Sequence, residues 1–315
     1  MRNLKSVFIL TMVLFVLVSL AGVASAQEFS VGMTVQDLGN QIWASTATEL
    51  EELVEEDGGE FTAVDCKSNA AEQISQIENF ISSGVDVIIV HPAEKNAVEE
   101  PLKRAREEGI KVYSWDEKLE NSDMNWIIDN YELGEMIGEH ASEWINEKLD
   151  GETQVGVLNY PQIGILKERG DGIVDAIKEH APDADIVAES SAINSTEGIE
   201  KTETFLQQYP DMKVIAAIGG GGAVGANEAV KANNKLTDDF GIFAADATDQ
   251  ELEAMTNNEA NRMSVLITGD AEKMADVIYG YVQKMLNDEE IEQNVYRELI
   301  PVTQENVDKY YDDQE

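Results

Sequence analysis

The sequence predicts an α/β protein with two domains, each built on a parallel sheet. After residue 27, short apolar runs rich in β-branched residues alternate with amphipathic helical patterns along nearly the whole chain. Such alternation is typical of parallel strands that helices cover on both faces. The roughly 290 residues that follow the N-terminal segment exceed what one hydrophobic core usually serves, so we expect two domains. No Pro- or Ser-rich linker separates them, so short crossings must connect them.

The first 26 residues have the layout of a secretory signal peptide. Arg2 and Lys5 form a short cationic head, residues 7–20 are apolar, and Ala24-Ser25-Ala26 supplies small residues for cleavage. We therefore exclude residues 1–26 from the fold and expect export to the periplasm. The alternative is an uncleaved membrane anchor, because the apolar run is nearly long enough to span a bilayer.

Acidic residues greatly outnumber basic ones. All 62 acidic residues but only 20 of the 22 basic ones follow residue 26, which gives that part of the chain a formal charge of −42. Such a field repels nucleic acid and anionic membranes, so neither is an expected partner. The acids are spread along the chain, and we interpret them as a solvated, halophilic-type surface whose self-repulsion salt screens.

Cysteine and histidine are too few for a disulfide or a thiolate metal cluster. Cys66 is the only cysteine, and His91, His140 and His180 lie in different segments. His140 falls on the inner face of a predicted helix, where we expect it to pack or to cap. The sequence predicts no metal site and no cofactor.

Eleven runs have the length and composition of strands. In chain order they are residues 29–34, 60–66, 85–92, 110–116, 125–129, 153–160, 184–190, 213–219, 240–246, 262–268 and 295–302. Helical patterns lie between most of them. Three apolar stripes at helical spacing predict core-facing helices, and they comprise Ile74, Ile77 and Ile81, then Leu133, Ile137, Trp144 and Ile145, then Met274, Ile278, Tyr281 and Met285.

One glycine-rich turn matches a nucleotide-binding pattern. Residues 214–225 read VIAAIGGGGAVG, in which Gly220, Gly222 and Gly225 have the G-x-G-x-x-G spacing of a dinucleotide-binding turn. An exported dinucleotide-dependent oxidoreductase is therefore an alternative function. Against it, the pattern occurs late in the chain, a run of four glycines satisfies part of it trivially, and no acid–base constellation lies nearby in the sequence.

Several predicted strand-to-helix turns place polar side chains beside aromatic ones. Asn40 lies near Trp43, Asp116 follows Trp115, and Tyr160 precedes Lys167. In open parallel sheets, ligands bind outside the carboxyl ends of the strands, where these turns lie. A polyhydroxylated ligand needs hydrogen-bonding partners for its hydroxyls and an apolar plate for its C–H face. Polar residues in such turns also serve as helix N-caps, so one pair alone is weak evidence.

The order of the turns and helices resembles a known family. The segments concerned include AAEQISQIENFISSGVDVIIVHPAEKNAVEEPLKRAREEGIKVYSWD, DNYELGEMIGEHASEWI, KERGDGI, YPDMKVIAAI, GANEAVKA and PVTQENVD. From about Phe29 to Val307 the chain resembles the periplasmic sugar-binding proteins of ABC transporters, of the ribose-binding type. The combination of these segments in this order is specific, although no single one is.

The resemblance implies two Rossmann-like lobes joined by a three-crossover hinge, the type I periplasmic binding fold. The N-terminal lobe would comprise residues 27–128 and 270–296, and the C-terminal lobe residues 129–269 and 297–315. Members of this family close on a ligand held between the lobes and deliver it to a membrane permease. No covalent chemistry is involved, so the chain would not be an enzyme and would have no catalytic residue.

The first part of the implied binding site follows the first and fourth strands. Asn40 and Trp43 match the first turn of sugar binders, with Ile42 in place of one aromatic residue. Asp116 keeps the acid of an Asp-Arg pair, and Glu117 replaces the arginine. Trp115 would add a second, less certain apolar plate.

The second part of the implied site departs further from a ribose binder. Lys167 stands where an arginine opens an R-E-R-G segment, and an aromatic position falls on or next to Asn194. An Asn-Asp pair falls on Gly219 and Gly220, whereas Asp246 is kept. We interpret the glycines as a wall opened for bulk, with backbone N–H groups offered to ligand hydroxyls. These changes favour another sugar, an acyclic polyol or a cyclitol over ribose, although Lys167 could accept a sugar acid.

The sequence thus predicts a monomeric solute-binding protein for a small sugar or polyol, with an ABC permease as partner and a chemoreceptor as a further possible partner. A transcription regulator's ligand domain shares this architecture. The signal peptide and the lack of a helix-turn-helix segment argue against that alternative.

Overall fold

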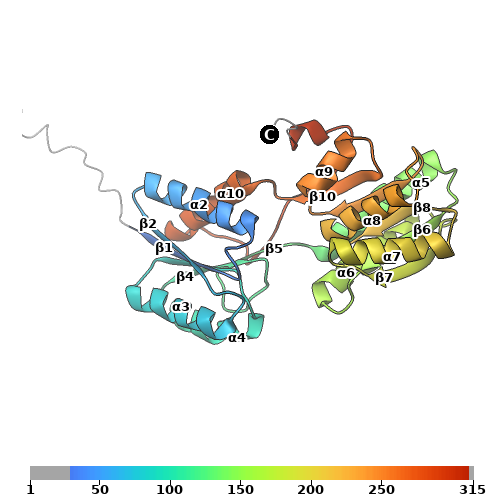
Figure 1. The fold of residues 1–315 in the computed structure, drawn as a ribbon. Coiled ribbons are helices and arrows are strands. Elements are labelled where there is room, and N and C mark those ends of the chain that lie inside the picture. The colour runs from blue at the N-terminus through green and yellow to red at the C-terminus, as the bar shows by residue number, and fades with distance from the viewer. Residues whose placement is uncertain (1–28, 312–315) are drawn as a thin grey trace, which may run out of the picture. The chain divides into compact units, whose positions relative to one another are not determined.

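The computed structural model describes residues 29–311 and contains two sheets of six strands, each covered by helices on both faces (Figure 1). The prediction of an α/β fold with two mostly parallel sheets is confirmed. The predicted signal peptide lies outside the described residues.

The first sheet has the strand order β11-β5-β4-β3-β1-β2. Its β1–β2, β1–β3, β3–β4 and β5–β11 pairs are parallel. Helices connect β1 to β2, β2 to β3 and β3 to β4, whereas residues 116–123 connect β4 to β5 without a helix. The strands are β1 (Ser30–Val35), β2 (Glu60–Asp65), β3 (Val87–Val90), β4 (Lys111–Trp115), β5 (Met124–Ile127) and β11 (Asn294–Tyr296).

Four helices cover this sheet: α2 (Gln41–Glu56), α3 (Ala70–Ser83), α4 (Lys95–Glu107) and α10 (Ala271–Leu286). In Figure 1, α3 and α4 lie on one face, and α2 and α10 on the other. The Asn69 side chain caps α3 by accepting from the Ala71 and Glu72 N–H groups, and Gly84 ends the helix at φ 69°. Ile77 of the first predicted stripe is fully buried in the core between α3, α4 and the sheet.

The second sheet has the order β12-β10-β9-β8-β6-β7. Its strands are β6 (Gln154–Asn159), β7 (Asp185–Ser191), β8 (Met212–Ala217), β9 (Gly241–Ala245), β10 (Asn261–Ile267) and β12 (Leu299–Thr303). The helices are α5 (Asn130–Lys148), α6 (Gly164–His180), α7 (Ser195–Gln208), α8 (Gly220–Ala232) and α9 (Asp249–Thr256). Leu133 and Ile173 place α5 and α6 in one core cluster, whereas Phe205 and Val230 place α7 and α8 in another.

The predicted strand at residues 295–302 is in fact two strands in different sheets. β11 pairs with β5 in parallel, whereas β12 pairs with β10 in antiparallel orientation. The chain changes from one sheet to the other at Arg297 and Glu298. Arg297 N donates to Ile127 O at the end of β5, and Glu298 O accepts from Thr268 N after β10, each at 2.8 Å. β12 is an edge strand, which explains why it tolerates a proline.

The described chain divides into two compact units. The first contains the residues up to Ser114, Leu119–Asp123 and Ala275–Ile291. The second contains Trp115–Lys118, Met124–Met274 and the residues from Glu292 onward.

The glycine run supports close packing of α8 on α7 in the second unit. A Cβ atom at Gly221 would overlap the carbonyl oxygen of Ile193, and one at Gly225 would overlap that of Ser195. At Gly222 the nearest atom to a Cβ would be a backbone oxygen at 3.3 Å. At Gly221 and Gly222 neighbouring backbone fills the space, so the interpretation of the run as a wall opened for bulk is wrong at these two glycines.

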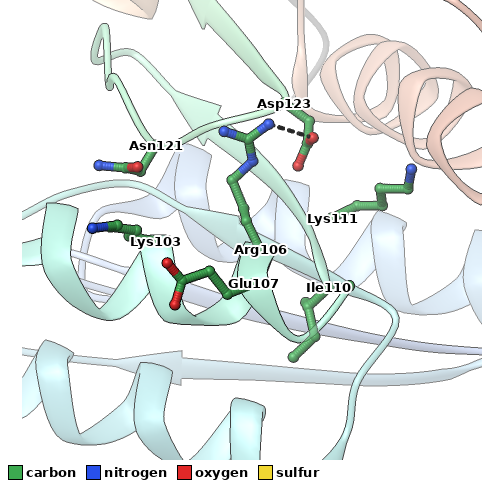
Figure 2. Close-up of a pocket in the computed structure, with 8 residues that line it drawn as sticks. Lys103, Arg106, Glu107, Ile110, Lys111, Asn121 and Asp123 are labelled. Carbon is green, nitrogen blue, oxygen red and sulfur yellow. Dashed lines mark hydrogen bonds and ion pairs between the residues drawn. The ribbon is translucent and has the colours of Figure 1, made fainter.

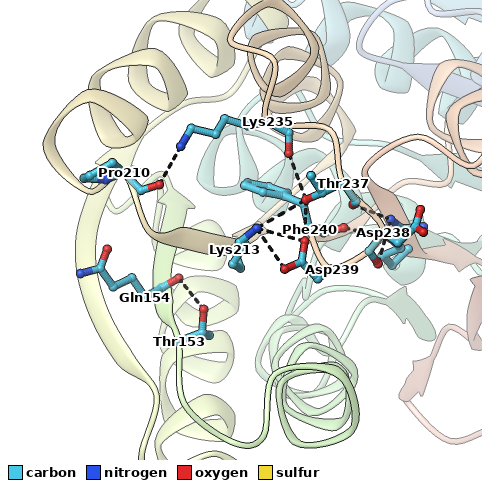
Figure 3. A network of polar contacts seen from close by, with 10 residues as sticks. Thr153, Gln154, Pro210, Lys213, Lys235, Thr237, Asp238, Asp239 and Phe240 are labelled. Atoms are coloured by element: carbon cyan, nitrogen blue, oxygen red, sulfur yellow. Dashed lines mark hydrogen bonds and ion pairs between the residues drawn. The ribbon is translucent and has the colours of Figure 1, made fainter.

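A polar network closes the amino-terminal edge of the second sheet (Figure 3). The Lys213 ammonium and the Thr237 hydroxyl both donate to the Asp239 carboxylate, at 3.0 and 2.5 Å. The Thr237 hydrogen bond, with Lys213, lowers the pKa of Asp239. The buried Arg262 donates through Nε to Phe240 O at 3.0 Å. Charges at this edge are thus satisfied within the protein.

Two helical glycines should respond oppositely to alanine. Gly225→Ala introduces a methyl group against the backbone of α7, and overpacking of this kind costs about 1–3 kcal/mol of unfolding free energy. Gly280→Ala on α10 meets no atom within 4 Å, and should stabilise the chain by roughly 0.5–1 kcal/mol through helix propensity. Urea denaturation of both variants measures this, and a Gly225→Ala variant as stable as wild type would contradict the packing account.

Candidate functional site

Asp246 lies in a strained turn at the carboxyl end of β9. Asp246 and Ala247 both have positive φ angles, 91° and 43°, which side-chain-bearing residues rarely adopt. The Asp246 carboxylate accepts from Gly220 N at 2.9 Å, and Ala247 N donates to the Ser264 hydroxyl at 2.9 Å. These bonds hold the turn so that the Asp246 side chain remains 45% exposed. Strain of this kind is concentrated at functional sites.

Arg169 lies beneath the same edge and faces Asp246. It belongs to α6, its side chain is 8% exposed, and its Nη1 lies 4.0 Å from the Asp246 carboxylate. Nη1 donates to Ile218 O at 2.6 Å, and Nη2 donates to the Asn130 side chain at 2.7 Å. The guanidinium therefore joins the end of β8, the start of α5 and the turn after β9.

Asp116 forms the second carboxylate–arginine pair. It follows β4 at φ 63°, and its carboxylate lies 2.7 Å from Nη1 of Arg297. The Asp116 side chain is 23% exposed and that of Arg297 is 7% exposed. The carboxylate therefore reaches solvent, whereas the arginine lies behind it.

The two pairs balance charge at this edge of the second unit. Burial lowers the pKa of Arg169, and the negative charges of Asp246 and then Asp116 partly offset that effect. A buried arginine keeps its charge because its reference pKa is so high. Asp116 and Asp246 thus present acceptor oxygens in fixed positions while two buried cations neutralise their charges.

Glu251 is a third acid behind the same edge, and it is fully buried on α9. Its carboxyl accepts from the N–H and the hydroxyl of Thr248 at 2.9 and 2.8 Å, as part of a capping box. Burial raises the pKa of Glu251 to about 8, and the negative charge of Asp246 adds to the rise. Near neutral pH the group is therefore mainly a neutral acid. It supports the Asp246 turn and lies against Gly220.

Asn40 and Trp43 lie at the carboxyl edge of the first sheet. The Asn40 side chain caps α2 by accepting from Ile42 N at 3.1 Å. Trp43 is half-buried, and its ring packs edge-on against His91 with 4.3 Å between centroids. His91 follows β3 and was not predicted as part of the site. Asn40 and Trp43 both stay predicted ligand contacts. The His91 ring packs against the Trp43 ring and supports it.

Four other predicted residues have local roles in the structure. Lys167 is exposed and forms an ion pair with Asp171 on the next turn of α6. The Asn194 side chain caps α7 by accepting from Glu197 N at 3.0 Å. Trp115 is buried, with its ring centroid 6.2 Å from that of Trp126, and Glu117 is half-buried.

Gly219 and Gly220 lie directly against the two acids. A Cβ at Gly219 would come within 2.8 Å of the Asp246 carboxylate, and one at Gly220 would overlap the Glu251 carboxyl. The Gly220 N–H is bonded to Asp246, so it is not offered to a ligand hydroxyl as expected from the sequence. Gly219 and Gly220 stay predicted ligand-contacting positions.

Arg169 and Arg297 were missed by sequence reasoning. The expectation from the resemblance was that two arginine donors of the site are lost, at Glu117 and Lys167. The structure places a buried arginine beside each acid from other positions. For Arg169 a signal existed, because a charged residue two positions from Lys167 on one helix must point to a different side. For Arg297, separated from Asp116 by 181 residues, the sequence offers none.

Two cavities occur in the first unit, both at the amino-terminal edge of its sheet. One of about 320 Å³ is lined by Arg106, Lys111 and Asp123 among others (Figure 2). Arg106 is paired with Asp123 and Lys111 with Asp288, so its charges are satisfied within the chain. The other, of about 670 Å³, lies between Phe29 and α10. Neither contains a predicted ligand residue.

Within residues 29–311, no helix combines the length and the hydropathy that crossing a bilayer requires. Over the same residues, the structure has no group of three or more His, Cys, Asp or Glu side chains arranged for a metal ion.

Two α/β units with polar side chains at the carboxyl ends of parallel strands define a ligand-binding protein of the doubly wound type. Residues 31–290 match the family model described as periplasmic binding protein domain. The chain belongs to this family, which confirms the resemblance seen in the sequence.

Curated and solved relatives agree with the family assignment. The ribose import binding protein of Bacillus subtilis is 26% identical, and the match covers 83% of this chain and 86% of that protein. A Bacillus halodurans ABC transporter solute-binding protein with bound myo-inositol has a TM-score of 0.73 at 22% identity, covering 91% and 98% of the two chains. A solute-binding protein of Actinobacillus succinogenes with bound D-allose has a TM-score of 0.75 at 21% identity, covering 90% and 100%.

The family consists of substrate-binding proteins of ABC transporters, so the prediction that the chain is not an enzyme is confirmed. The alternative of a dinucleotide-dependent oxidoreductase finds no support. The glycines that suggested it are accounted for by the packing of α8 on α7 and by the Gly220–Asp246 hydrogen bond.

Glu251 predicts a pH dependence of stability. The unfolded chain ionises this group near pH 4.5, whereas the folded chain keeps the proton up to about pH 8. The folded state therefore binds more protons between these values, and the contribution of Glu251 to the free energy of unfolding falls as pH rises from 4.5 to 8. Glu251→Gln removes this dependence, so wild type should lose a few kcal/mol relative to the variant between pH 5 and pH 8.

Urea denaturation at a series of pH values measures the difference between wild type and Glu251→Gln. Glu253→Gln, an exposed position on the same helix, is the matched control and should leave the wild-type pH profile unchanged. A difference between wild type and Glu251→Gln that stays constant from pH 5 to pH 8 would contradict the assignment of a buried neutral acid.

Proposed function

We propose that the chain is the solute-binding component of an ABC importer and binds a small, uncharged sugar or polyol without covalent chemistry. Membership of the periplasmic binding protein family supports the general role. The bound myo-inositol and D-allose of two structural relatives support the ligand class. In this proposal Asp116 and Asp246 bind ligand hydroxyls, and Trp43 provides an apolar plate for the C–H face.

The observation that carries the ligand class is the pairing of each predicted carboxylate with a buried arginine. Asp116 faces Arg297 and Asp246 faces Arg169. Such paired carboxylates accept hydrogen bonds from hydroxyls in fixed directions but attract a cation little, because the pairs are neutral as a whole. A neutral ligand with several hydroxyls fits this chemistry better than a cation.

An anionic ligand fits less well. Lys167 was the residue expected to accept a sugar acid, and its ammonium is engaged by Asp171 on the exposed face of α6. The guanidinium groups of Arg169 and Arg297 are bonded to backbone and side-chain acceptors within the second unit. A carboxylate on the ligand would therefore compete with existing partners and would face two acids.

The remaining parts of the proposal come from the sequence and from the family. Residues 1–26 act as a cleavable signal peptide, and the mature chain works in the periplasm as a monomer. An ABC permease receives the ligand, and a chemoreceptor is a further candidate partner. The ligand is enclosed between lobes with the limits 27–128 plus 270–296 and 129–269 plus 297–315.

A ligand panel tests the proposed function. A ligand present at a hundred times its dissociation constant stabilises the folded state by roughly 2.7 kcal/mol. We expect D-ribose, D-allose or myo-inositol to raise the melting temperature, whereas choline as a cation and D-gluconate as an anion should not. Differential scanning fluorimetry at low and high salt measures this. The proposal fails if the neutral compounds leave the melting temperature unchanged while either charged compound raises it.

We further propose that the acidic surface adapts the chain to high salt. The formal charge of −42 after residue 26 produces self-repulsion in the folded state. Raising NaCl from 0.1 M to 1 M shortens the screening length from about 10 Å to about 3 Å, so the free energy of unfolding should rise. Sucrose of equal osmolality is the control. Equal stabilisation by both solutes would show that exclusion of solute, and not charge screening, is responsible.

A further inference from the structure

We propose that Arg297 is a positioning residue for ligand binding, because its guanidinium fixes the Asp116 carboxylate in the orientation that the ligand meets. This inference rests on the proposed function and adds to it a residue that the family resemblance did not assign. It concerns the second unit alone, which contains Arg297 and all of the contacts described below.

Every nitrogen of the Arg297 guanidinium has a partner. Nη1 donates to the Asp116 carboxylate at 2.7 Å, and Nε donates to the Thr268 hydroxyl at 3.0 Å. Nη2 donates to Ile267 O at 3.2 Å and lies 3.2 Å from the Met274 sulfur. Only an arginine offers planar donors in several directions at once, so the group can hold Asp116 while it is itself held.

Packing fixes the plane of the guanidinium. Its carbon lies 4.5 Å from the centroid of the Trp126 ring, and Trp126 is 2% exposed. The backbone is tied as well, since Arg297 N donates to Ile127 O at 2.8 Å. A buried cation stacked on an aromatic ring and bonded along its edge has little freedom to rotate.

Asp116 needs such a partner because its own backbone is strained. Its φ of 63° lies in the left-handed region, and Thr268, which accepts from the same arginine, has a φ of 74°. Residues other than glycine persist in this region only when their surroundings hold them there. Arg297 is bonded to both side chains and therefore joins two strained turns, one after β4 and one after β10.

The contacts also involve residues near three of the five points at which the chain passes between units. These three passages occur just before Trp115, just after Met274 and just before Glu292. Asp116, Met274 and Arg297 lie close to these three points in the sequence. Arg297 bonds to the partly exposed Asp116 carboxylate and contacts Met274 near the second passage. A residue needed only for core packing would not require these contacts. Glu117, where the family resemblance implies an arginine, cannot supply this cation.

The experiment measures ligand affinity by isothermal titration calorimetry with whichever of D-ribose, D-allose and myo-inositol binds wild type most tightly. The variants are Arg297→Met, Arg297→Lys, Asp116→Asn and the double variant Arg297→Met/Asp116→Asn. We expect Arg297→Met to weaken binding by at least about tenfold, which corresponds to roughly 1.4 kcal/mol. Arg297→Lys should recover part of the lost affinity, because lysine keeps the positive charge but lacks the planar, forked set of N–H donors.

The double variant separates positioning from structure. If Arg297 acts through Asp116, then Arg297→Met should weaken binding much less in the Asp116→Asn background than in wild type. A matched control is Arg262→Met, because Arg262 is 6% exposed, is stacked 4.9 Å from the Trp144 centroid and lies at the opposite edge of the sheet. It should lower the melting temperature but leave affinity unchanged.

Three results would overturn the inference: wild-type affinity in Arg297→Met, equal losses in the two backgrounds, or a loss of affinity in Arg262→Met as large as in Arg297→Met. If Arg297→Met does not fold, the same cycle is made with Arg297→Lys, and the same comparisons decide. Absence of binding by wild type to all three compounds would instead contradict the proposed function, and the inference with it.

Discussion

Parallel pairing of strands is the constraint on which the candidate site depends. A parallel strand needs a crossover connection to its neighbour, most often a helix, and strands that pair in parallel end at the same edge of the sheet. In the second sheet this brings the ends of β8, β9 and β10 together. The backbone at Ile218 and the side chains of Asp246 and Thr268 become near neighbours there, although they are far apart in the sequence. The polar groups of the site are a consequence of strand order.

Charge burial decides what these strand ends can bind. An isolated buried cation is costly, and it is tolerated only when acceptors satisfy its donors. Arg169 and Arg297 meet this condition through carbonyl oxygens, side-chain oxygens and one carboxylate each. The two acids thereby keep their positions and their acceptor oxygens, while their negative charge is balanced from below. This local balance contrasts with the chain as a whole, in which acidic residues far exceed basic ones.

The strands and the family could be predicted because their signals are local. The run at residues 85–92 is apolar and β-branched, and it forms the buried strand β3. The run at residues 295–302 looks equally continuous, yet it changes sheets at Arg297 because distant backbone groups at Ile127 and Thr268 pair with it. The sequence of residues 295–302 alone does not indicate that the strand changes from one sheet to the other.

The sequence named the two acids of the candidate site but not their arginine partners. Asp116 and Asp246 were identified from the turns after strands and from the family resemblance, whereas the arginines depend on tertiary contacts. Lys167 was named from its place in the family's segment and Arg169 was not considered, although about 200° of helical rotation separates the two positions and Arg169 is on the buried side of α6. Gly221 and Gly222 were misread as open space, because the backbone atoms that lie against them come from the turn before α7.

The most direct test of the account is a crystal structure of the chain grown with the neutral polyol or sugar that binds most tightly. The account predicts ligand hydroxyl oxygens within hydrogen-bond distance, about 2.5–3.2 Å, of the carboxylates of both Asp116 and Asp246. Arg297 and Arg169 should remain bonded behind them. A ligand bound elsewhere, for instance in the cavity beside Arg106 and Lys111, or one that contacts neither carboxylate, would contradict it.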